Sequence, residues 1–335
     1  MSVIDERFEF ARQRLTAGEP VVLMVVVSVK GSTPGKPGFK MVVDRQGGHR
    51  GTIGGGIMEL NLLDRAREML ADGQHRPELV TQVHHKSAPP EHRSGMICAG
   101  TQWLVLLPMV PADLPSLTHI CNRLSADRPG LLEIDPGGWR FVEGASSPDR
   151  HLWREAAEQP WQWREILGMP DTVHVIGSGH VGLAVCRTLS LLDMRVVAYD
   201  HRAEVDTFTN NTWAAKKVCL PYEALGDHIE EGPYSYVVIV TTAFHTDAAA
   251  LQAVIHKDLR YLGLMGSAAK IREIYRTLKA AGTPEDLLAK VRAPIGIPIG
   301  PETPAEIAVS IAAEIVQERR RPPGEAPTPA VPGSS

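Results

Sequence analysis

The sequence has little of what marks secreted, membrane-spanning or nucleic-acid-binding proteins. Its 335 residues include only four cysteines, Cys98, Cys121, Cys186 and Cys219, which form no C-x-x-C pair and no disulfide framework. No apolar run approaches the roughly 20 residues that a membrane-spanning helix needs, and the first 14 residues are charged, without a signal-peptide core. A formal net charge of −4 leaves no broad basic field for nucleic acid. We therefore expect a cytoplasmic protein without membrane or nucleic-acid partners.

The hydrophobic content of 43% over 335 residues is enough for two packed cores. In the first half, segments typical of strands and of helices mix without a repeat. Helical spacing predicts helices over 3–17, 57–70 and 114–125. Apolar runs predict strands over 21–29, 39–43, 79–84 and 102–107.

From Asp171 onward, strand-like and helix-like segments alternate, which is typical of a parallel sheet covered by helices. The expected strands are Val173–Ile176, Arg195–Tyr199, Lys216–Leu220, Val237–Val240 and Arg260–Leu264. The sequence therefore predicts an α/β protein with an N-terminal mixed α+β domain over 1–143 and a C-terminal Rossmann-like parallel-sheet domain over 171–318. We interpret residues 144–170 as a connector and the proline-rich residues 319–335 as a disordered tail.

Three smaller expectations follow from residue type. The tryptophans of the connector are expected to pack it against one or both domains, namely Trp153, Trp161 and Trp163. Three cysteines lie on helical or strand patterns and are expected in the core, namely Cys121, Cys186 and Cys219. Two helices are expected to begin at a capping threonine followed by a proline, namely at Thr303 and Thr283.

A glycine-rich segment fits the dinucleotide-binding pattern G-x-G-x-x-G, namely Gly177-Ser178-Gly179-His180-Val181-Gly182. It follows an expected strand and opens an expected helix over 181–192, which is the context that this motif requires. Gly177 permits the tight turn, Gly179 lets the backbone approach a pyrophosphate, and Gly182 lets the helix pack closely on the strand. The free amides at the start of the helix favour an anion.

Side chains near this loop suggest what it binds. Asp200, at the end of the second expected strand, could accept hydrogen bonds from ribose hydroxyls, whereas the neighbouring Arg202 leaves room for a phosphate. His180 either faces the ligand or is an exposed residue of the turn. The alternative interpretation is a Rossmann-type domain that keeps the fold and binds nothing at this loop.

Two glycine-rich loops lie close together in the first half, over 31–38 and 51–56. The second ends in Gly54-Gly55-Gly56 ahead of a helix, where backbone amides can converge on an anionic or planar ligand. Glu59, one turn into that helix, could bind the ring nitrogens of a heterocycle or a backbone amide. The alternative interpretation is a pair of glycine-rich turns without a ligand.

Other groups in this half could also take part in binding. Lys36 and Lys40 could neutralise a phosphate. Cys98 lies in a loop of small residues over 94–100, where a thiol can be exposed and reactive.

Together these segments resemble the XdhC/CoxI family. The family pattern G-S-x-P-x-x-x-G-x-x-M-x-V is matched by Gly31–Val43, and G-x-x-G-G-G-x-x-E is matched by Gly51–Glu59. A cysteine loop, a G-x-G-H-V-G loop, an aspartate–x–arginine and a long C-terminal motif are matched by Gly95–Gly100, Gly177–Gly182, Asp200–Arg202 and Pro294–Ile315. The resemblance spans nearly the whole chain outside the connector and the tail.

The resemblance implies an accessory chaperone rather than a metabolic enzyme. Such a protein is expected to bind molybdenum cofactor, as molybdopterin or its cytosine dinucleotide form. It would support sulfuration of the cofactor by a cysteine desulfurase and insert the cofactor into the large subunit of a xanthine dehydrogenase/CO dehydrogenase-type molybdenum hydroxylase. A homodimer is expected from the prevalence of symmetric dimers.

The resemblance also assigns roles to residues. Cys98 would contact molybdenum, as a soft ligand, or relay sulfur. The other residues expected to bind the cofactor are Gly54, Gly55, Gly56, Glu59, Gly177, Gly179, His180, Gly182, Asp200, Arg202 and Thr242.

Two other functions are compatible with the same fingerprint. One is an NAD(P)-dependent oxidoreductase with His245, His180 or Lys270 as the acid–base group, although the sequence offers no tyrosine–lysine pair or histidine–aspartate motif that can be assigned to hydride chemistry. The other is a non-catalytic nucleotide sensor, in which ligand binding changes a contact with a partner.

Overall fold

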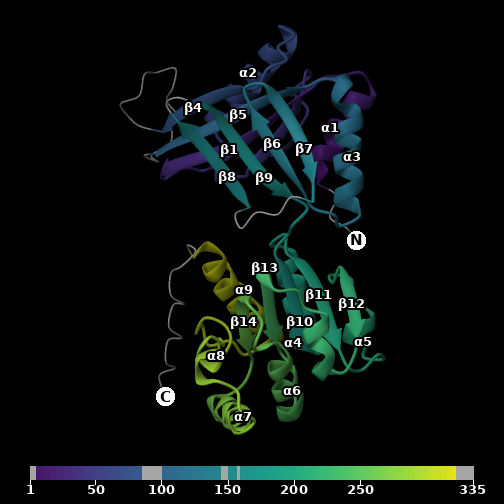
Figure 1. Ribbon diagram of the computed structural model, residues 1–335, viewed down its shortest axis with the longest axis vertical. Coiled ribbons are helices and arrows are strands. Elements are labelled where there is room, and N and C mark those ends of the chain that lie inside the picture. Colours follow the sequence, from purple (N-terminus) through teal and green to yellow (C-terminus); the bar gives the residue numbers. More distant parts are fainter. Residues whose placement is uncertain (1–4, 85–99, 145–149, 157–158, 322–335) are drawn as a thin grey trace. The chain divides into compact units, whose positions relative to one another are not determined.

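The computed structural model describes residues 5–84, 100–144, 150–156 and 159–321 (Figure 1). The chain divides into two compact units, unit 1 over 1–169 and unit 2 over 170–335. Within the described residues, no helix is both long enough and apolar enough to cross a membrane. Cys98 and residues 322–335 lie outside the described residues, so the expectations for that cysteine and for most of the tail stay predictions.

Five antiparallel strands form the first sheet of unit 1, in the order β3-β2-β1-β5-β4. Their bounds are Val21–Gly31 (β1), Lys40–Asp44 (β2), His49–Gly51 (β3), Glu78–His84 (β4) and Gly100–Met109 (β5). Residues 21–27 of β1 are all buried, since both faces of this central strand are covered. This double burial explains why β1 is a continuous apolar run instead of an alternating one.

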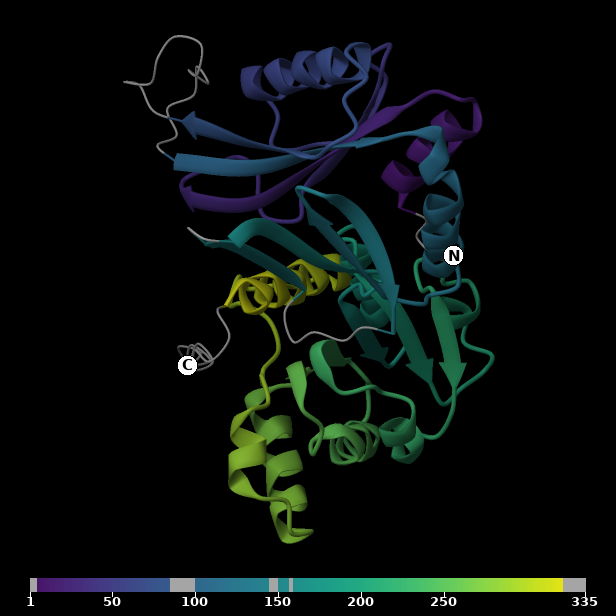
Figure 2. The ribbon, with the colours of Figure 1, turned by 45° about the horizontal axis from the view of Figure 1, so that its top comes forward.

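The helices of unit 1 cover the two faces of this sheet. They are α1 (Glu6–Thr16), α2 (Ile57–Ala71), η2 (Pro111–Asp113) and α3 (Leu114–Ser125). Leu62 and Met69 of α2 pack on one face, against alternate residues of β1 such as Met24. The helices α1 and α3 and a second sheet share the core on the opposite face. Figure 2 shows α2 on one side of the first sheet and the second sheet on the other.

The second sheet of unit 1 contains four antiparallel strands in the order β7-β6-β9-β8. Their bounds are Gly130–Asp135 (β6), Gly138–Glu143 (β7), His151–Ala156 (β8) and Gln159–Leu167 (β9). Most of the segment that the sequence pattern indicated as a connector therefore belongs to unit 1. Trp163 is fully buried in that core, and Trp153 and Trp161 pack against it, which confirms that the tryptophans pack on a domain. Alternate residues of a strand face one side, so β9 buries Trp163 and Leu167 together.

Unit 2 is built on five parallel strands in the order β12-β11-β10-β13-β14. Their bounds are Thr172–Ile176 (β10), Arg195–Asp200 (β11), Lys216–Cys219 (β12), Gly232–Ile239 (β13) and Leu259–Leu264 (β14). The predicted Rossmann-like parallel sheet is confirmed. The strand order reverses at β10, so the crevice beyond the carboxyl ends of β10 and β13 is the position where such sheets bind ligands.

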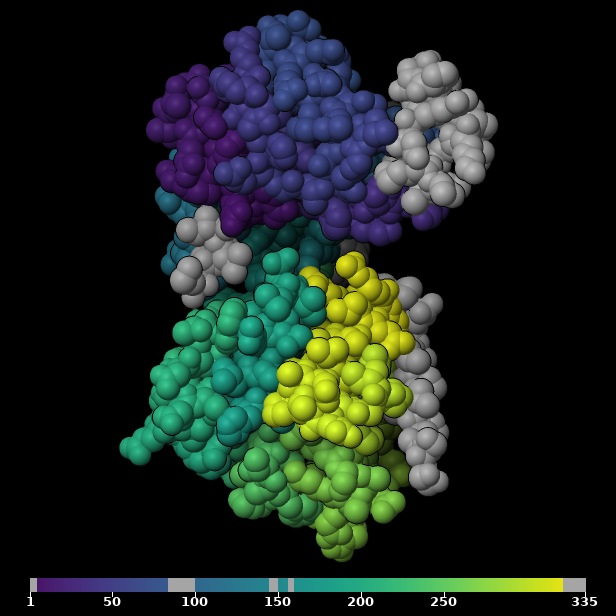
Figure 3. Space-filling view, turned by 180° about the vertical axis from the view of Figure 1, so that it is seen from behind, coloured from purple at the N-terminus to yellow at the C-terminus, as the bar shows by residue number. Residues whose placement is uncertain are grey.

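Helices cover both faces of the parallel sheet. They are α4 (His180–Ser190), α5 (Asp206–Thr209), η3 (Tyr222–Asp227), α6 (Phe244–Val254), α7 (Ala268–Ala280), α8 (Glu285–Ala289) and α9 (Pro304–Arg320). Leu189 of α4 and Ile311 of α9 share one core with Val175 of β10. Figure 3 shows α9, in yellow, beside the teal residues of α4 on that face. Leu251 of α6 and Ile274 of α7 bury the other face.

Two local expectations were wrong in part. Cys121 and Cys186 are buried as predicted, but Cys219 is exposed, because it ends the edge strand β12. Thr303 caps α9 with the predicted capping box. Thr283 does not cap α8, because this helix begins at Glu285 with Pro284 as its N-cap. The amide of Thr283 instead donates to the carbonyl of Leu278 near the end of α7.

Candidate functional site

The glycine loop that follows β10 has the geometry that its sequence predicts. Gly177 has φ of +98°, a conformation that suits glycine. A Cβ at position 182 would lie 2.0 Å from the carbonyl oxygen of Gly177, so only glycine lets α4 pack this closely on the loop. A Cβ at position 179 would meet no atom within 4 Å, which leaves that side of the loop open to a ligand.

Asp200 binds this loop and does not point into solvent. Its carboxylate is fully buried and accepts a hydrogen bond from the amide of Ser178 at 2.8 Å. The amide of Arg202 donates to it at 3.0 Å, and the guanidinium of Arg202 donates twice more, at 2.9 and 3.0 Å. Burial alone would raise the pKa of Asp200, but the hydrogen bonds from Arg202 and Ser178 outweigh burial and lower it. The residue expected to receive a ribose is thus an ionised group with protein donors already around it.

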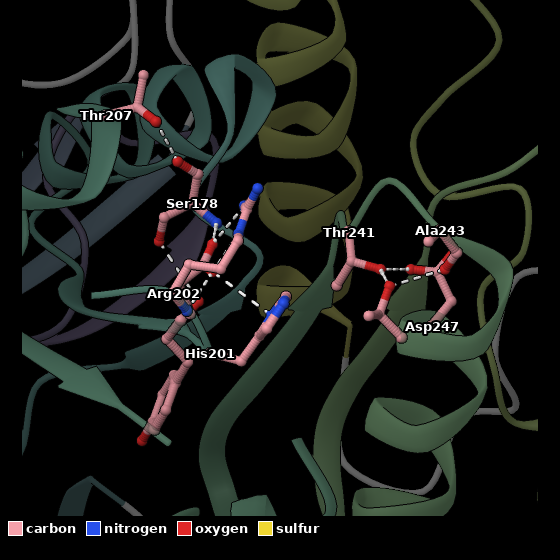
Figure 4. A network of polar contacts seen from close by, with 10 residues as sticks. Ser178, His201, Arg202, Thr207, Thr241, Ala243 and Asp247 are labelled. Carbon is pink, nitrogen blue, oxygen red and sulfur yellow. Dashed lines mark hydrogen bonds and ion pairs between the residues drawn. The ribbon is translucent and has the colours of Figure 1, made fainter. Parts of the chain in front are cut away.

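A second polar network lies where β13 meets α6 (Figure 4). Thr241 donates its hydroxyl hydrogen to the carboxylate of Asp247, which also pairs with the ammonium of Lys270. The hydroxyl oxygens of Thr241 and Thr246 lie 2.7 Å apart. Burial raises the pKa of Asp247, although the hydrogen bonds from Lys270 and Thr241 oppose that rise.

This second network escaped the sequence reasoning, which named only Lys270 among its members. The available signal is the polar stretch Thr241-Thr242 directly after a buried strand, with an aspartate five residues further along. Polar residues at the carboxyl end of a parallel strand are typical of ligand sites.

The two networks border one cavity of about 160 Å³. It is lined by Gly177 and Gly179 after β10, His201 and Arg202 after β11, Tyr222 of η3, and residues 240–243, His245 and Thr246 around the start of α6. These segments meet at the carboxyl ends of three parallel strands, as the strand order predicts. Sites for whole drug-sized ligands occupy about 300–1,000 Å³, so this cavity suits one end group of a larger ligand.

The expected crevice residues fall into three places. Gly177, Gly179, Arg202 and Thr242 line the cavity. Gly182 and Asp200 are buried beneath it. His180 is exposed as the first residue of α4 and is not among the residues that line the cavity.

In unit 1, Glu59 closes the triple-glycine loop on itself. One carboxylate oxygen of Glu59 accepts from the hydroxyl of Thr52 at 2.7 Å and from the amides of Ile53 and Gly55 at 3.0 and 2.9 Å. The sequence left open whether Glu59 binds a ring nitrogen or a backbone amide. In the structure it binds backbone amides. The glycines of this loop adopt positive φ angles of +131°, +77° and +78°, for Gly54, Gly55 and Gly56.

The two glycine-rich loops of unit 1 touch each other. A Cβ at position 35 would lie 2.4 Å from the carbonyl oxygen of Ile53, and one at position 54 would lie 2.6 Å from the amide nitrogen of Gly35. The two lysines of the region differ. Lys36 is exposed, whereas Lys40 is buried against Glu165 of β9 and cannot neutralise a phosphate in this arrangement.

We expect Glu59→Gln to loosen the triple-glycine loop. Hydrogen bonds to a charged acceptor contribute about 1.5–3 kcal/mol, so opening of the loop should become at least about tenfold more frequent. The measurement is hydrogen exchange of the amides of Ile53 and Gly55. Glu68→Gln, an exposed change on the same helix, is the control. Equal exchange rates in the wild-type chain and Glu59→Gln would show that this carboxylate does not hold the loop.

The described residues offer no preformed metal site. No group of three or more histidine, cysteine, aspartate or glutamate side chains in these ranges could hold a metal ion. The metal contact predicted for Cys98 falls outside them.

Two family models match the chain. The model of the XdhC and CoxI family matches residues 14–83, and that of the XdhC Rossmann domain matches residues 173–315. Together the two segments make up more than half of the chain, and each lies in one of the two units.

Individual proteins resemble the chain over most of its length. The uncharacterized protein YqeB of Escherichia coli is 26% identical over 91% of the chain, and the chain spans 44% of the length of YqeB. The molybdenum cofactor insertion chaperone PaoD of Escherichia coli is 22% identical over 92% of the chain and 87% of its own length. A solved structure from Bacillus halodurans, described as a xanthine dehydrogenase, covers 96% of the chain and is itself covered to 98%, with a TM-score of 0.72 and 22% identity. At that identity the solved structure shows a shared fold and nothing about activity.

Proposed function

Because the chain belongs to the XdhC/CoxI family, we propose that it is an accessory chaperone that binds molybdenum cofactor and inserts it into a molybdenum hydroxylase of the xanthine dehydrogenase/CO dehydrogenase type. The observation that carries this proposal is the resemblance to PaoD, which extends over 92% of the chain and 87% of that chaperone. A similarity of both units together points to the role of the whole protein more directly than a match to the Rossmann domain alone.

The chemistry of the crevice supports the proposal. Molybdopterin carries a phosphate, and the cavity of unit 2 is bordered by Arg202, by Gly179 at the N-cap of α4, and by His245 in the first turn of α6. Both helices begin without a side-chain cap, so their first amides are available to an anion. A cargo phosphate at this position would be stabilised by hydrogen bonds and by the guanidinium.

The finer steps of the proposal rest on the family motifs. While the cofactor is held, a cysteine desulfurase would supply its terminal sulfur. The thiolate of Cys98 would either contact molybdenum or attack the persulfide of the desulfurase, which releases the desulfurase thiol and leaves the transferred sulfur on Cys98 as a persulfide. A homodimer would be the working form.

The test is to co-express the chain with a pathway that makes molybdenum cofactor, and to measure molybdenum and released pterin per purified chain. We expect near-stoichiometric amounts of both in the wild-type chain and a loss of both in Cys98→Ala. The matched control is Cys219→Ala, which removes an exposed thiol at the edge of unit 2.

Three outcomes separate the alternatives. Loss of cofactor and of hydroxylase activation in Cys98→Ala alone supports the chaperone. Equal activation by the wild-type chain and Cys98→Ala contradicts the role of this thiol. A folded chain that carries neither molybdenum nor pterin but turns over NAD(P)H would favour the oxidoreductase, for which His245 is the candidate group that lines the cavity.

A further inference from the structure

The acceptor positions of Asp200 are filled by the protein itself. In dinucleotide-binding domains, the acidic residue at the end of the second strand accepts hydrogen bonds from ribose hydroxyls. An ionised carboxylate has about four acceptor positions. Oδ1 of Asp200 accepts from N and Nε of Arg202, and Oδ2 accepts from N of Ser178 and Nη2 of Arg202. A ribose hydroxyl could bind here only by displacing one of these four donors.

Displacement of these donors would be costly. Asp200 has no exposed surface, so a hydroxyl would have to reach the carboxylate through the guanidinium of Arg202. The two side-chain hydrogen bonds from Arg202 are bidentate and charge-assisted, which makes them stronger than the hydrogen bond of a neutral hydroxyl. The amide of Ser178 also depends on Asp200 for its acceptor, so a shift of the carboxylate would disturb the glycine loop.

The same pair changes the charge at the rim of the cavity. The side chain of Arg202 is 47% exposed and lines the cavity together with His201, whose side chain is 42% exposed. No aspartate or glutamate is among the described residues that line it. In an NAD site an acidic side chain faces the ribose at this point. Here the guanidinium of Arg202 faces the cavity, and Asp200 is buried behind it.

The volume of the cavity limits what enters it. A space of about 160 Å³ takes an end group and not the whole of a dinucleotide. Gly179 leaves the loop open at this point, because its Cβ position meets no atom within 4 Å. A doubly charged phosphate monoester combines small size with the charge that Arg202 complements.

We propose that Arg202 is the specificity-determining residue of this crevice, closing Asp200 to ribose hydroxyls and selecting ligands that present a phosphate monoester over NAD. The inference rests on the proposed function and deepens it, since the terminal phosphate of molybdopterin is a group of this class. The 2′-phosphate of NADP belongs to the same class, so the test separates the two sources.

The experiment is titration calorimetry of the full chain with four probes, namely 5′-CMP, cytidine, NAD⁺ and NADP⁺. Wild-type protein should bind 5′-CMP at least tenfold more tightly than cytidine or NAD⁺. Arg202→Gln should weaken 5′-CMP binding by about 10- to 100-fold, the usual range for a hydrogen bond to a charged group, while NAD⁺ binding stays equal or increases. Arg276→Gln, which removes an exposed arginine of α7, should bind every probe as the wild-type chain does.

A second variant protects the test against misfolding. Arg202→Lys keeps a cation beside Asp200 but loses the bidentate pair. It should retain a preference for 5′-CMP over NAD⁺ that is smaller than in the wild-type chain and larger than in Arg202→Gln. Thermal unfolding followed by circular dichroism establishes that each variant is folded.

The outcomes distinguish this inference from the proposed function. Equal affinity of the wild-type chain for NAD⁺, NADP⁺ and 5′-CMP, or an unchanged ratio in Arg202→Gln, would overturn the role of Arg202. A preference for NADP⁺ over both NAD⁺ and 5′-CMP that is lost in Arg202→Gln would support selection by Arg202. It would identify the ligand as a dinucleotide with a 2′-phosphate and not as molybdopterin. Molybdenum and pterin measured on the same preparations test the chaperone role separately.

Discussion

Replacing Lys40 with methionine is expected to lower the free energy of unfolding of unit 1 by about 3–5 kcal/mol, the usual effect of breaking a buried ion pair. Lys40 of β2 and Glu165 of β9 are 3% and 5% exposed and pair between the two sheets. The ammonium also donates to the carbonyl of Gly38 at 3.0 Å. Without it, the carboxylate of Glu165 stays buried, and among the described residues His151, 3.5 Å away, is the group left to oppose its charge.

Urea unfolding followed by tryptophan fluorescence measures this effect. Five of the six tryptophans lie in unit 1, and only Trp213 lies in unit 2, so the signal reports mainly on unit 1. Lys36→Met, an exposed change in the loop before β2, is the matched control and should leave stability within about 0.5 kcal/mol. The double variant Lys40→Met/Glu165→Leu should recover most of the loss, because no charge is then left unpaired. An unfolding midpoint for Lys40→Met equal to that of the wild-type chain would refute the argument.

The pH dependence of this pair gives an independent check. Burial alone would raise the pKa of Glu165, but Lys40 and His151 outweigh burial and lower the pKa to about 2, from an ordinary value of 4.5. The pair therefore stabilises the wild-type fold above about pH 4.5, and this contribution is lost as the pH falls toward 2. In Lys40→Met, burial acts without the ammonium and should raise the pKa of Glu165. Acid then protonates the buried carboxylate, which removes the unpaired charge that destabilises the variant. The stability deficit of the variant should therefore shrink as the pH falls.

Gly182→Ala is the second change with a large expected effect, a destabilisation of unit 2 by about 1–3 kcal/mol. The added Cβ would lie 2.0 Å from the oxygen and 3.0 Å from the carbon of the Gly177 carbonyl. Both atoms are backbone and cannot rotate away, so α4 must move off the loop. That movement should also widen the crevice and weaken binding of any ligand there.

Gly179→Ala is the control for this prediction. Position 179 has φ of −73°, and its Cβ would meet no atom within 4 Å, so the fold should lose less than about 1 kcal/mol. Hydrogen exchange of the α4 amides measures the stability of both variants. Similar exchange in Gly182→Ala and Gly179→Ala would contradict the prediction, because the loop would then accommodate the added Cβ at position 182 without loss of stability.

The sequence predicted the local parts of the fold well. The expected strands after β10, such as 195–199 and 260–264, correspond to β11 (195–200) and β14 (259–264). Strands that are buried on both faces must be continuous apolar runs, and such runs are visible without tertiary information. The turn at Gly177 and the close packing at Gly182 were likewise predictable, because the fingerprint encodes steric requirements over only six residues.

Predictions that depended on distant partners were less successful. Lys40 looked like a residue for a phosphate, but its partner Glu165 lies 125 residues away in the chain. The segment around Trp161 and Trp163 resembled a connector in sequence because it contains prolines and glycines. It is a strand, and one face of it becomes buried only when the two sheets of unit 1 pack together. Asp200 fits a ribose acceptor by its position, and only the structure shows that Arg202 already binds it.

The sequence by itself determined the family, the parallel sheet of unit 2 and the glycine loops, because each depends on residue spacing within a short segment. The tertiary structure decided which of the charged side chains near these loops can meet a ligand. A carboxylate or an ammonium is available only if the folded chain does not bring an opposite charge or a row of amides to it. Glu59, Lys40 and Asp200 acquire such partners on folding, while Arg202 keeps part of its surface at the cavity.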